Sequence, residues 1–258
     1  MNLPLEADDS GSSMKAVPDI SVLYEDQDLV AVFKPAGLMI HPDGKSVEPT
    51  LTDWLVANYK EAREVGGVIK LASGGEVPRA GILHRIDRET SGVVVLARSQ
   101  NAFDFFQKQF IDRLVKKQYY AFVFGEVAEP AGTISLPIGR SRDDFRKRAV
   151  GKRARGLARP AETVFRRVMS ARGFSFLELE PTTGRTHQLR VHLEAIDHPI
   201  VCDSRYGPKR PCALGFRRLA LHAASLSISL LSGRKVLIKA PFPPDFQRAI
   251  ELLAVRPE

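Results

Sequence analysis

The sequence has few of the residues that mark secreted, metal-binding or membrane proteins. It contains only two cysteines, Cys202 and Cys212, among 258 residues. Two cysteines are too few for a disulfide framework, and they lack the second pair of a zinc motif. We therefore expect reduced thiols in a cytoplasmic protein. No apolar run approaches the roughly 20 residues that span a bilayer, and the polar, acidic N-terminus does not match a secretory signal, so we expect no membrane partner.

Acidic residues are also in short supply. The chain has 38 Lys and Arg against 30 Asp and Glu, a formal net charge of +8, which favours a polyanionic partner such as nucleic acid or an acidic membrane surface. Residues 140–159 hold nine basic residues and two aspartates, a net charge of +7. This segment is either a solvated flexible loop or a surface for RNA phosphates, and we favour phosphate contact. The nine residues are Arg140, Arg142, Arg146, Lys147, Arg148, Lys152, Arg153, Arg155 and Arg159.

Larger repeating patterns are missing as well. There is no internal repeat, no heptad array and no glycine-rich phosphate-binding fingerprint. Strand and helix patterns mix without regular β-α alternation, which argues against a doubly wound sheet. Residues 1–18 carry turn formers and little apolar periodicity, so they predict a disordered tail. Residues 19–258 are predicted to form a single α+β domain with a mixed, mostly antiparallel central sheet.

Local patterns place the expected elements. Residues 21–24 and 29–33 predict a hairpin around a polar turn, and Thr50 with Asp53 predicts a capped helix over residues 50–63. Ser99 is expected to cap a second helix. Its apolar stripe is either core or a base-stacking surface, and core is favoured; the stripe consists of Phe103, Phe106, Phe110 and Leu114. Thr186 is expected to cap a third helix, and further elements are predicted at 118–124, 162–169, 174–180, 217–229, 235–239 and 245–253.

One segment concentrates charge directly before a buried strand. His84-Arg85-Ile86-Asp87-Arg88-Glu89-Thr90-Ser91-Gly92 runs into the apolar residues 93–97. Desolvating charges is unfavourable, so chains rarely place them against a buried strand unless a site needs them there. From its chemistry alone the segment is either a reactive carboxylate, Asp87, held among arginines, or a surface ion-pair cluster that caps a strand.

The same segment resembles the signature of the RluA family of RNA pseudouridine synthases. Four more stretches resemble this family in the same order, at residues 30–38, 117–125, 183–192 and 221–223. The resemblance implies the pseudouridine synthase fold, with a sheet in two halves, flanking helices and a central catalytic cleft. It also implies a stand-alone catalytic domain, because the tail is too short for the N-terminal RNA-binding module that some relatives carry. The implied partner is tRNA or rRNA, and we expect a monomer.

The implied activity isomerises uridine to pseudouridine, moving the glycosidic bond from N1 to C5 of the base. Nothing is added or lost, so neither a cofactor nor a metal is required. Asp87 resembles the catalytic aspartate of the family, and a single carboxylate fits rearrangement better than glycoside hydrolysis, which uses two. Arg190 resembles the partner that keeps this aspartate ionised, although without the family it would be an exposed helix arginine. Tyr119 resembles the tyrosine assigned to stacking on uracil and to proton abstraction; otherwise it is a strand tyrosine with one buried edge.

The resemblance also implies residues that bind the substrate. A uridine in folded RNA must be flipped out of the stack, and Arg85 resembles the residue that fills the gap. Leu221 resembles part of the apolar wall under the base. Arg185 either binds phosphate or braces its loop, and bracing is favoured, while His84 has an orienting role rather than that of a general base. The full set of candidates is His84, Arg85, Arg88, Thr90, Arg185 and Leu221.

Two alternatives to this activity remain open. The chain is otherwise a non-catalytic RNA-binding protein or ribosome assembly factor on the same fold, or an unrelated enzyme that breaks glycosyl bonds of nucleosides. The basic segment favours a polymer over a nucleoside. A metal role for His187 and His192 is disfavoured, because their spacing differs from the i, i+4 pair of zinc proteases and no adjacent carboxylate completes a set.

Overall fold

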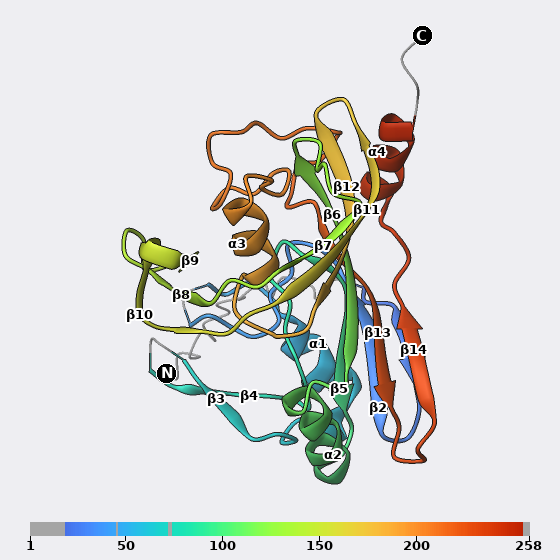
Figure 1. The fold of residues 1–258 in the computed structure, drawn as a ribbon. Helices are drawn as coiled ribbons and strands as arrows, with labels where there is room; N and C mark the ends of the chain where they lie inside the picture. Colours follow the sequence, from blue (N-terminus) through green and yellow to red (C-terminus); the bar gives the residue numbers. More distant parts are fainter. Residues whose placement is uncertain (1–18, 45, 72–73, 255–258) are drawn as a thin grey trace, which may run out of the picture.

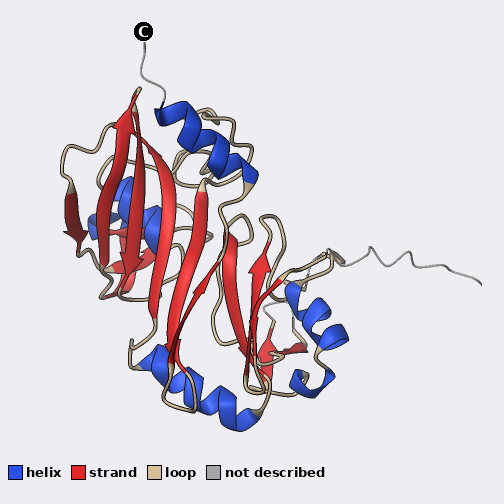
Figure 2. Ribbon diagram, turned by 90° about the vertical axis from the view of Figure 1, so that its right-hand side faces the viewer, coloured by secondary structure: helices blue, strands red, loops and turns tan. Residues whose placement is uncertain are grey.

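A nine-stranded sheet runs through the molecule (Figures 1 and 2). The computed structural model describes residues 19–44, 46–71 and 74–254, so the predicted tail at 1–18 lies outside the described residues. The strands follow the order β1-β2-β5-β13-β6-β12-β11-β7, with β14 paired to β13. Their bounds are β1 Val22–Glu25, β2 Leu29–Lys34, β5 Ser91–Ala97, β6 Lys116–Phe124, β7 Ala131–Ile134, β11 Thr163–Ala171, β12 Phe174–Pro181, β13 Leu221–Ser229 and β14 Lys235–Lys239.

The sheet consists of two halves that meet at β13. Only two residue pairs, His222–Ser91 and Ala223–Gly92, join β13 to β5, and this is the parallel step in an otherwise antiparallel sheet. Farther along, β13 leaves β5 and pairs with β14, while β6 follows its other edge. Gly92 has φ +124°, and a Cβ there would overlap the carbonyl oxygen of Ala223. Glycine is therefore required where the two halves join.

Four α-helices cover the sheet: α1 Leu51–Asn58, α2 Gln100–Ile111, α3 Gln188–Ala195 and α4 Pro244–Ala254. Alternate residues of β5 point to opposite faces. Val94 packs in the same apolar cluster as Leu51 of α1, whereas Val95 packs in the cluster of Phe106 of α2. The two helices therefore cover opposite faces of one half of the sheet. In the other half, α3 and α4 lie on opposite faces (Figures 1 and 2), and both contribute to one large core cluster.

The basic segment forms regular structure rather than a flexible loop. Strands β8 (Ile138–Ser141), β9 (Arg148–Val150) and β10 (Ala154–Arg159) make a small antiparallel sheet in the order β10-β8-β9. A short 3-10 helix, η2 (Gly151–Arg153), joins the last two. The small sheet projects beside α3 (Figure 1). The flexible-loop alternative is therefore wrong, and the basic side chains are held on a defined backbone.

Several expected boundaries need correction. The helix expected over residues 50–63 ends at Asn58 and is followed by the 3-10 helix η1 (Lys60–Ala62), although its capping box at Thr50 is confirmed. Ser99 caps α2 as expected. Thr186 does not cap α3, because His187 takes that place in a left-handed conformation. Two further differences remain. Strand β13 begins at Leu221 rather than at residue 217, and β3 (Val68–Lys70) and β4 (Glu76–Pro78) form a hairpin where no element was predicted.

The two cysteines form a disulfide between Cys202 and Cys212, whose Cα atoms lie 4.6 Å apart. The expectation of reduced thiols is therefore wrong for this structure. A count of cysteines excludes a framework of several bridges, but it does not show that the fold brings these two residues together. The bridge closes the loop that follows α3.

In the described part of the chain, no helix is both long and apolar enough to cross a membrane.

Candidate active site

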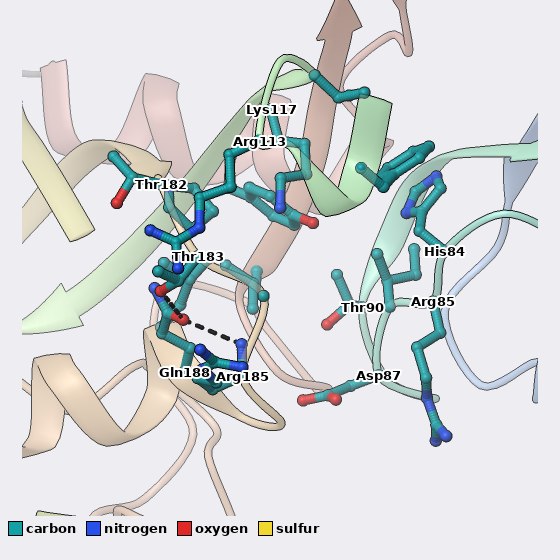
Figure 3. Close-up of a pocket in the computed structure, with 18 of the residues that line it drawn as sticks. His84, Arg85, Asp87, Thr90, Arg113, Lys117, Thr182, Thr183, Arg185 and Gln188 are labelled. Atoms are coloured by element: carbon teal, nitrogen blue, oxygen red, sulfur yellow. Dashed lines mark hydrogen bonds between the residues drawn. The ribbon is translucent and has the colours of Figure 1, made fainter. Parts of the chain in front are cut away.

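A cavity of about 540 Å³ opens where the two halves of the sheet meet. One wall is the loop before β5, which carries His84, Asp87 and Thr90, and the facing wall is the loop that leads into α3 (Figure 3). Strands β6 and β13 contribute residues between them. The cavity is lined by all three catalytic candidates and by five of the six substrate-binding candidates: Asp87, Tyr119, Arg190, His84, Arg85, Thr90, Arg185 and Leu221. The fold thus unites residues from four separate stretches of the sequence.

Asp87 is held from across the cavity by Arg190. The Nη1 group of Arg190, on α3, donates to Oδ2 of Asp87 at 3.0 Å, which joins residues 103 positions apart in the sequence. The other carboxylate oxygen of Asp87 has no hydrogen-bond partner within the described residues, and the side chain points into the space between the two walls (Figure 3). The Arg190 side chain is only 9% exposed. It is a buried ion-pair partner and not the exposed helix arginine of the alternative interpretation.

Arg190 is itself held by a second aspartate that the sequence did not point to. Asp203, fully buried in the loop after α3, accepts from Nε and Nη2 of Arg190, both at 2.8 Å. Burial alone would lower the pKa of Arg190, but the hydrogen bonds and charges of Asp203 and Asp87 raise it above its usual range. The guanidinium therefore stays charged between two carboxylates. No local pattern identified Asp203, because its partner lies on the preceding helix.

The backbone of the Asp87 loop is tied to β2 by Lys34. Its ammonium group donates to the carbonyl oxygens of Pro35 (2.8 Å), Leu38 (2.8 Å) and Arg88 (2.9 Å), and the side chain is fully buried. Burial lowers the pKa of Lys34 to about 7, while the charges of Glu89 and Asp87 oppose that shift. Three carbonyl acceptors match the three N–H donors that only the protonated amine has. Lys34 was missed as a site residue, although a lysine at the end of an apolar strand was a visible signal.

Tyr119 lies on β6 and lines the cavity. Burial raises its pKa, and the nearby charge of Asp87 raises it further. The phenol is therefore protonated at neutral pH, so no preformed phenolate is present in the unbound protein. Tyr120 next to it faces other partners, since its hydroxyl donates to Glu178 and its ring stacks on Phe176.

His84 holds its loop in place rather than presenting a base. Its Nε2 accepts the backbone N–H of Val95 at 3.2 Å, and its ring stacks on Phe110 with centroids 5.1 Å apart. Burial lowers its pKa to about 3, so the imidazole is neutral at neutral pH. The aromatic stripe of α2 is thus divided: Phe103 and Phe106 are buried core, Phe110 supports His84 at the cavity, and Leu114 is exposed, contrary to the predicted continuous stripe.

The remaining candidates differ in how they meet the cavity. Thr90 is almost fully buried, and its hydroxyl has no hydrogen-bond partner in the part of the chain that the structure describes. Arg85 is exposed at the rim. Arg88 does not line the cavity; its Nη2 pairs with Glu48 at 2.6 Å and its Nε donates to the carbonyl oxygen of Gly37.

The wall that faces Asp87 is held by Gln188, the first residue of α3. Its Oε1 accepts from the hydroxyl of Thr183 (2.6 Å) and from the backbone N–H of Arg185 (3.0 Å), as Figure 3 shows. Nε of Arg185 donates to the carbonyl oxygen of Pro160 at 3.1 Å, which supports the bracing role. Arg113 and Lys117 also line the cavity and were not foreseen. They are two further basic residues at this cavity.

The two histidines of the 183–192 stretch have separate partners. Nδ1 of His187 is hydrogen-bonded to the hydroxyl of Tyr206 at 2.9 Å. In His192 both ring nitrogens are engaged, Nδ1 with Thr163 and Nε2 with the carbonyl oxygen of Leu136. His192 therefore has no ring nitrogen left for a ligand. Across the described residues, no group of three or more His, Cys, Asp or Glu is arranged to hold a metal ion.

Comparison with known proteins identifies the family. Residues 28–195 match the family of RNA pseudouridylate synthases. An uncharacterised RNA pseudouridine synthase of Bacillus subtilis is 34% identical over 236 residues, which cover 91% of this chain and 73% of the relative. The chain belongs to the RNA pseudouridylate synthase family. Ribosomal large subunit pseudouridine synthase D of Xanthomonas campestris pv. campestris is 37% identical over 246 residues, covering 91% of this chain and 69% of that protein.

Solved structures agree with this assignment. The human RNA pseudouridylate synthase domain containing 1 superposes with a TM-score of 0.70 at 27% identity, and the match covers 89% of this chain and 86% of that one. The expected pseudouridine synthase fold is therefore confirmed. So is the expected activity: the protein is an RNA pseudouridine synthase, an isomerase that converts uridine in RNA to pseudouridine.

Proposed function

We propose that Asp87 is the carboxylate that traps the electron-poor sugar or base while the glycosidic bond moves. The N1–C1′ bond breaks, the C5–C1′ bond forms, C5 loses its proton and N1 gains one, so the net composition is unchanged. The observation that carries this role is the single hydrogen bond from Arg190. It orients Asp87 through one oxygen and leaves the other facing the cavity. Among the described residues, no second carboxylate lines the cavity, which suits a rearrangement without water.

Tritium release from RNA labelled at uracil C5 tests this role, because C5 loses its hydrogen only when it becomes the glycosidic carbon. We expect release by the unaltered protein and none by Asp87→Asn or Asp87→Ala, with RNA binding retained by both. Asp104→Asn, at an exposed position on α2, is the matched control. Equal release by Asp87→Asn would remove Asp87 from the chemistry. Loss of RNA binding in the same variant would instead make it a binding residue.

Tyr119 is proposed to stack on the target uracil and to take part in transfer of the C5 proton. Because its phenol is protonated in the unbound protein, the hydroxyl must give up its proton before it can accept another. Tyr119→Phe keeps the ring and Tyr119→Ala removes it, so the two roles separate. Loss of tritium release with unchanged affinity in Tyr119→Phe supports proton transfer, whereas a further loss of affinity in Tyr119→Ala supports stacking.

Thr90 and Arg85 are proposed to bind the flipped nucleotide. The buried hydroxyl of Thr90 lacks a partner among the described residues, so a polar group of the substrate would satisfy it. Thr90→Val is nearly isosteric and removes only that hydrogen bond, which corresponds to about a tenfold loss of kcat/KM; Thr90→Ser should retain most activity. Arg85 at the cavity rim fits the residue that fills the gap left by the base. Leu221, nearly buried at the start of β13, is proposed as the apolar wall.

The substrate is proposed to be rRNA or tRNA, and the protein an RluA-type enzyme that acts as a cytoplasmic monomer. Similarity to proteins named ribosomal large subunit pseudouridine synthase D makes rRNA the first pool to assay. The basic 140–159 segment is proposed to contact RNA phosphates. Tritium release from separately labelled tRNA and rRNA pools distinguishes the two substrate classes.

A further inference from the structure

A second cavity, of about 390 Å³, lies beside the Asp87 cavity. Its walls come from the small sheet and from the loop before α3. Five arginines line it, and we call it the arginine cavity: Arg140, Arg148, Arg155, Arg159 and Arg185. Arg185 lines both cavities, which places the arginine cavity next to the site of the chemistry.

None of the five arginines has an acidic partner in the described part of the chain. Within residues 19–44, 46–71 and 74–254, no carboxylate oxygen lies within 4.0 Å of any of their side-chain nitrogens. Other arginines of the same segment are paired: Arg146 binds Asp144, and Arg153 binds Glu194 through two hydrogen bonds of 2.7 and 2.8 Å. Like charges around one hollow repel, although water and salt reduce this repulsion at the exposed Arg140, Arg155 and Arg159. A ligand that supplies negative charge would replace the repulsion by attraction.

We propose that the arginine cavity is a subsite for backbone phosphates of RNA next to the target uridine. The planar guanidinium group matches phosphate oxygens through paired hydrogen bonds. The small sheet holds Arg140, Arg148, Arg155 and Arg159 on three neighbouring strands, and Arg185 connects them to the wall that faces Asp87. The inference rests on the proposed RNA substrate. It goes further by distinguishing the arginines that line this cavity from Arg146 and Arg153 of the same segment, which are paired with carboxylates.

The test measures RNA affinity as a function of salt, in Asp87→Asn protein so that the RNA is not modified. Arg155→Gln and Arg159→Gln remove charges that line the cavity. Arg146→Gln and Arg153→Gln remove the same charge from paired positions of the segment, and Lys235→Gln, at an exposed position on β14, is a distant control. Each cavity substitution should weaken binding about five- to tenfold near physiological salt and reduce the slope of log affinity against log salt by about 0.7.

The paired substitutions remove the same formal charge, but an arginine held by a carboxylate makes no direct phosphate contact. Its loss acts only through attraction that salt screens, so affinity should change by about twofold or less. Equal losses at cavity and paired positions would overturn the subsite and leave only diffuse attraction. Tritium release is then measured with the same arginine substitutions in protein that keeps Asp87, which tests this proposal separately from the proposed function. Higher KM with unchanged kcat supports the subsite, whereas absent release from every labelled RNA, with the affinity pattern intact, counts against the proposed substrate alone.

The orientation of Arg190 is set by residues other than Asp87, and this supports a second, independent inference. Its guanidinium gives two hydrogen bonds to Asp203 and one to Asp87. Asp203 is fixed in turn, since its Oδ1 also accepts the backbone N–H groups of Arg205 and Tyr206, both at 2.9 Å. The ring of Tyr206 lies over the Arg190 guanidinium, 5.1 Å from its Cζ. Arg190 is therefore oriented whether or not Asp87 is bound to it.

We infer that Asp203 is a positioning residue for the isomerisation. Asp203 accepts the hydrogen bonds from Nε and Nη2 of Arg190. Asp87 therefore receives a single hydrogen bond, from Nη1, and keeps one carboxylate oxygen free. Without Asp203, the guanidinium would be free to rotate and bind both oxygens of Asp87. A carboxylate held on both oxygens is a weaker nucleophile. Asp203 thus acts through Arg190 and does not touch the substrate.

Asp203→Asn and Asp203→Glu test this role, with Glu61→Gln as the control, because Glu61 accepts two hydrogen bonds from Arg98 and neither residue lines the Asp87 cavity. A positioning role predicts that kcat falls about 100-fold in Asp203→Asn, while KM for RNA stays within about threefold. Glu61→Gln should keep both constants. If Asp203→Asn does not fold, Asp203→Glu, which keeps the charge but shifts it by one methylene, is measured in the same way. A kcat that falls only in proportion to the folded fraction would overturn the inference.

Discussion

The Asp87 cavity and the arginine cavity share Arg185 but treat charge in opposite ways. Around Asp87, other groups of the protein bind the buried charges: Arg190 lies between two aspartates and Lys34 is surrounded by three carbonyl oxygens. In the arginine cavity, no carboxylate of the described residues forms an ion pair with any of the five guanidinium groups. These partners within the protein hold the side chains around Asp87 in the positions that the isomerisation needs. Unpaired charges fit a ligand that brings the opposite charge with it.

Removing an arginine should therefore change the free energy of unfolding differently in the two cavities. The largest decrease is expected when Arg190 is replaced. Arg190→Gln leaves Asp203 as a buried charge without its partner, so we expect the free energy of unfolding to fall by about 3–5 kcal/mol. Activity should be lost as well. Urea unfolding followed by circular dichroism measures this change. Arg190→Lys should recover part of the stability but not the two-pronged contact with Asp203. An unchanged unfolding midpoint in Arg190→Gln would show that Asp203 needs no internal partner.

A second substitution examines whether the backbone of the Asp87 loop depends on its own buried charge. Lys34→Met fills a similar volume but leaves three carbonyl oxygens without the ammonium donors, and we expect a loss of about 3 kcal/mol. Because Lys34 joins β2 to the loop at Arg88, tritium release should also decrease. Lys60→Met, at an exposed position, is the matched control. A stable and fully active Lys34→Met protein would show that other contacts hold the loop.

Lowering the pH should decrease the stability of the junction between the two halves of the sheet without changing the charge of the arginine cavity. His222 is fully buried at the junction between β5 and β13, where its Nδ1 contacts the hydroxyl of Ser91 at 2.9 Å. Burial lowers its pKa to about 4. The folded protein thus favours the neutral ring, and the resulting stability is complete above the ordinary pKa near 6.5 and is lost as the pH falls towards 4.

Between pH 7 and pH 5 this one group should lower the free energy of unfolding by about 2 kcal/mol. Urea unfolding at several pH values measures the loss, and His222→Gln should be less stable at pH 7 but should lose less on acidification. Arginines keep their charge throughout this range, so the contribution of Arg155 and Arg159 to RNA affinity should not change. A His222→Gln protein with the same pH dependence as the unaltered one would assign the effect to other groups.

The smallest effect on stability is expected in the arginine cavity. The double substitution Arg155→Gln and Arg159→Gln removes repulsion and breaks no ion pair, so the free energy of unfolding should stay within about 0.5 kcal/mol of the original or rise slightly. RNA affinity should nevertheless decrease. Thermal unfolding and RNA titration on the same samples measure both quantities. A clear loss of stability would mean that these arginines have internal partners, and the contrast between the two regions would fail.

Local patterns were sufficient for most of the elements. The capping box at Thr50, the cap at Ser99 and the hairpin of β1 and β2 follow from residues within a few positions of one another. The helix after His187 was placed less well, because its start is decided by Gln188, which binds Thr183 and the carbonyl oxygen of Glu162. Such contacts leave no periodic signal in the sequence.

By itself, the sequence determined the family, the candidate Asp87 and the place where positive charge accumulates, because each of these lies in a short continuous stretch. Only the tertiary structure decided which charges are paired. It brought Arg190 to Asp87 and to Asp203, joined Cys202 to Cys212, and left Arg155 and Arg159 facing a hollow. The physical reason is that the state of a charge depends on its burial and on partners within a few ångströms. Those partners are brought together by the packing of the two halves of the sheet.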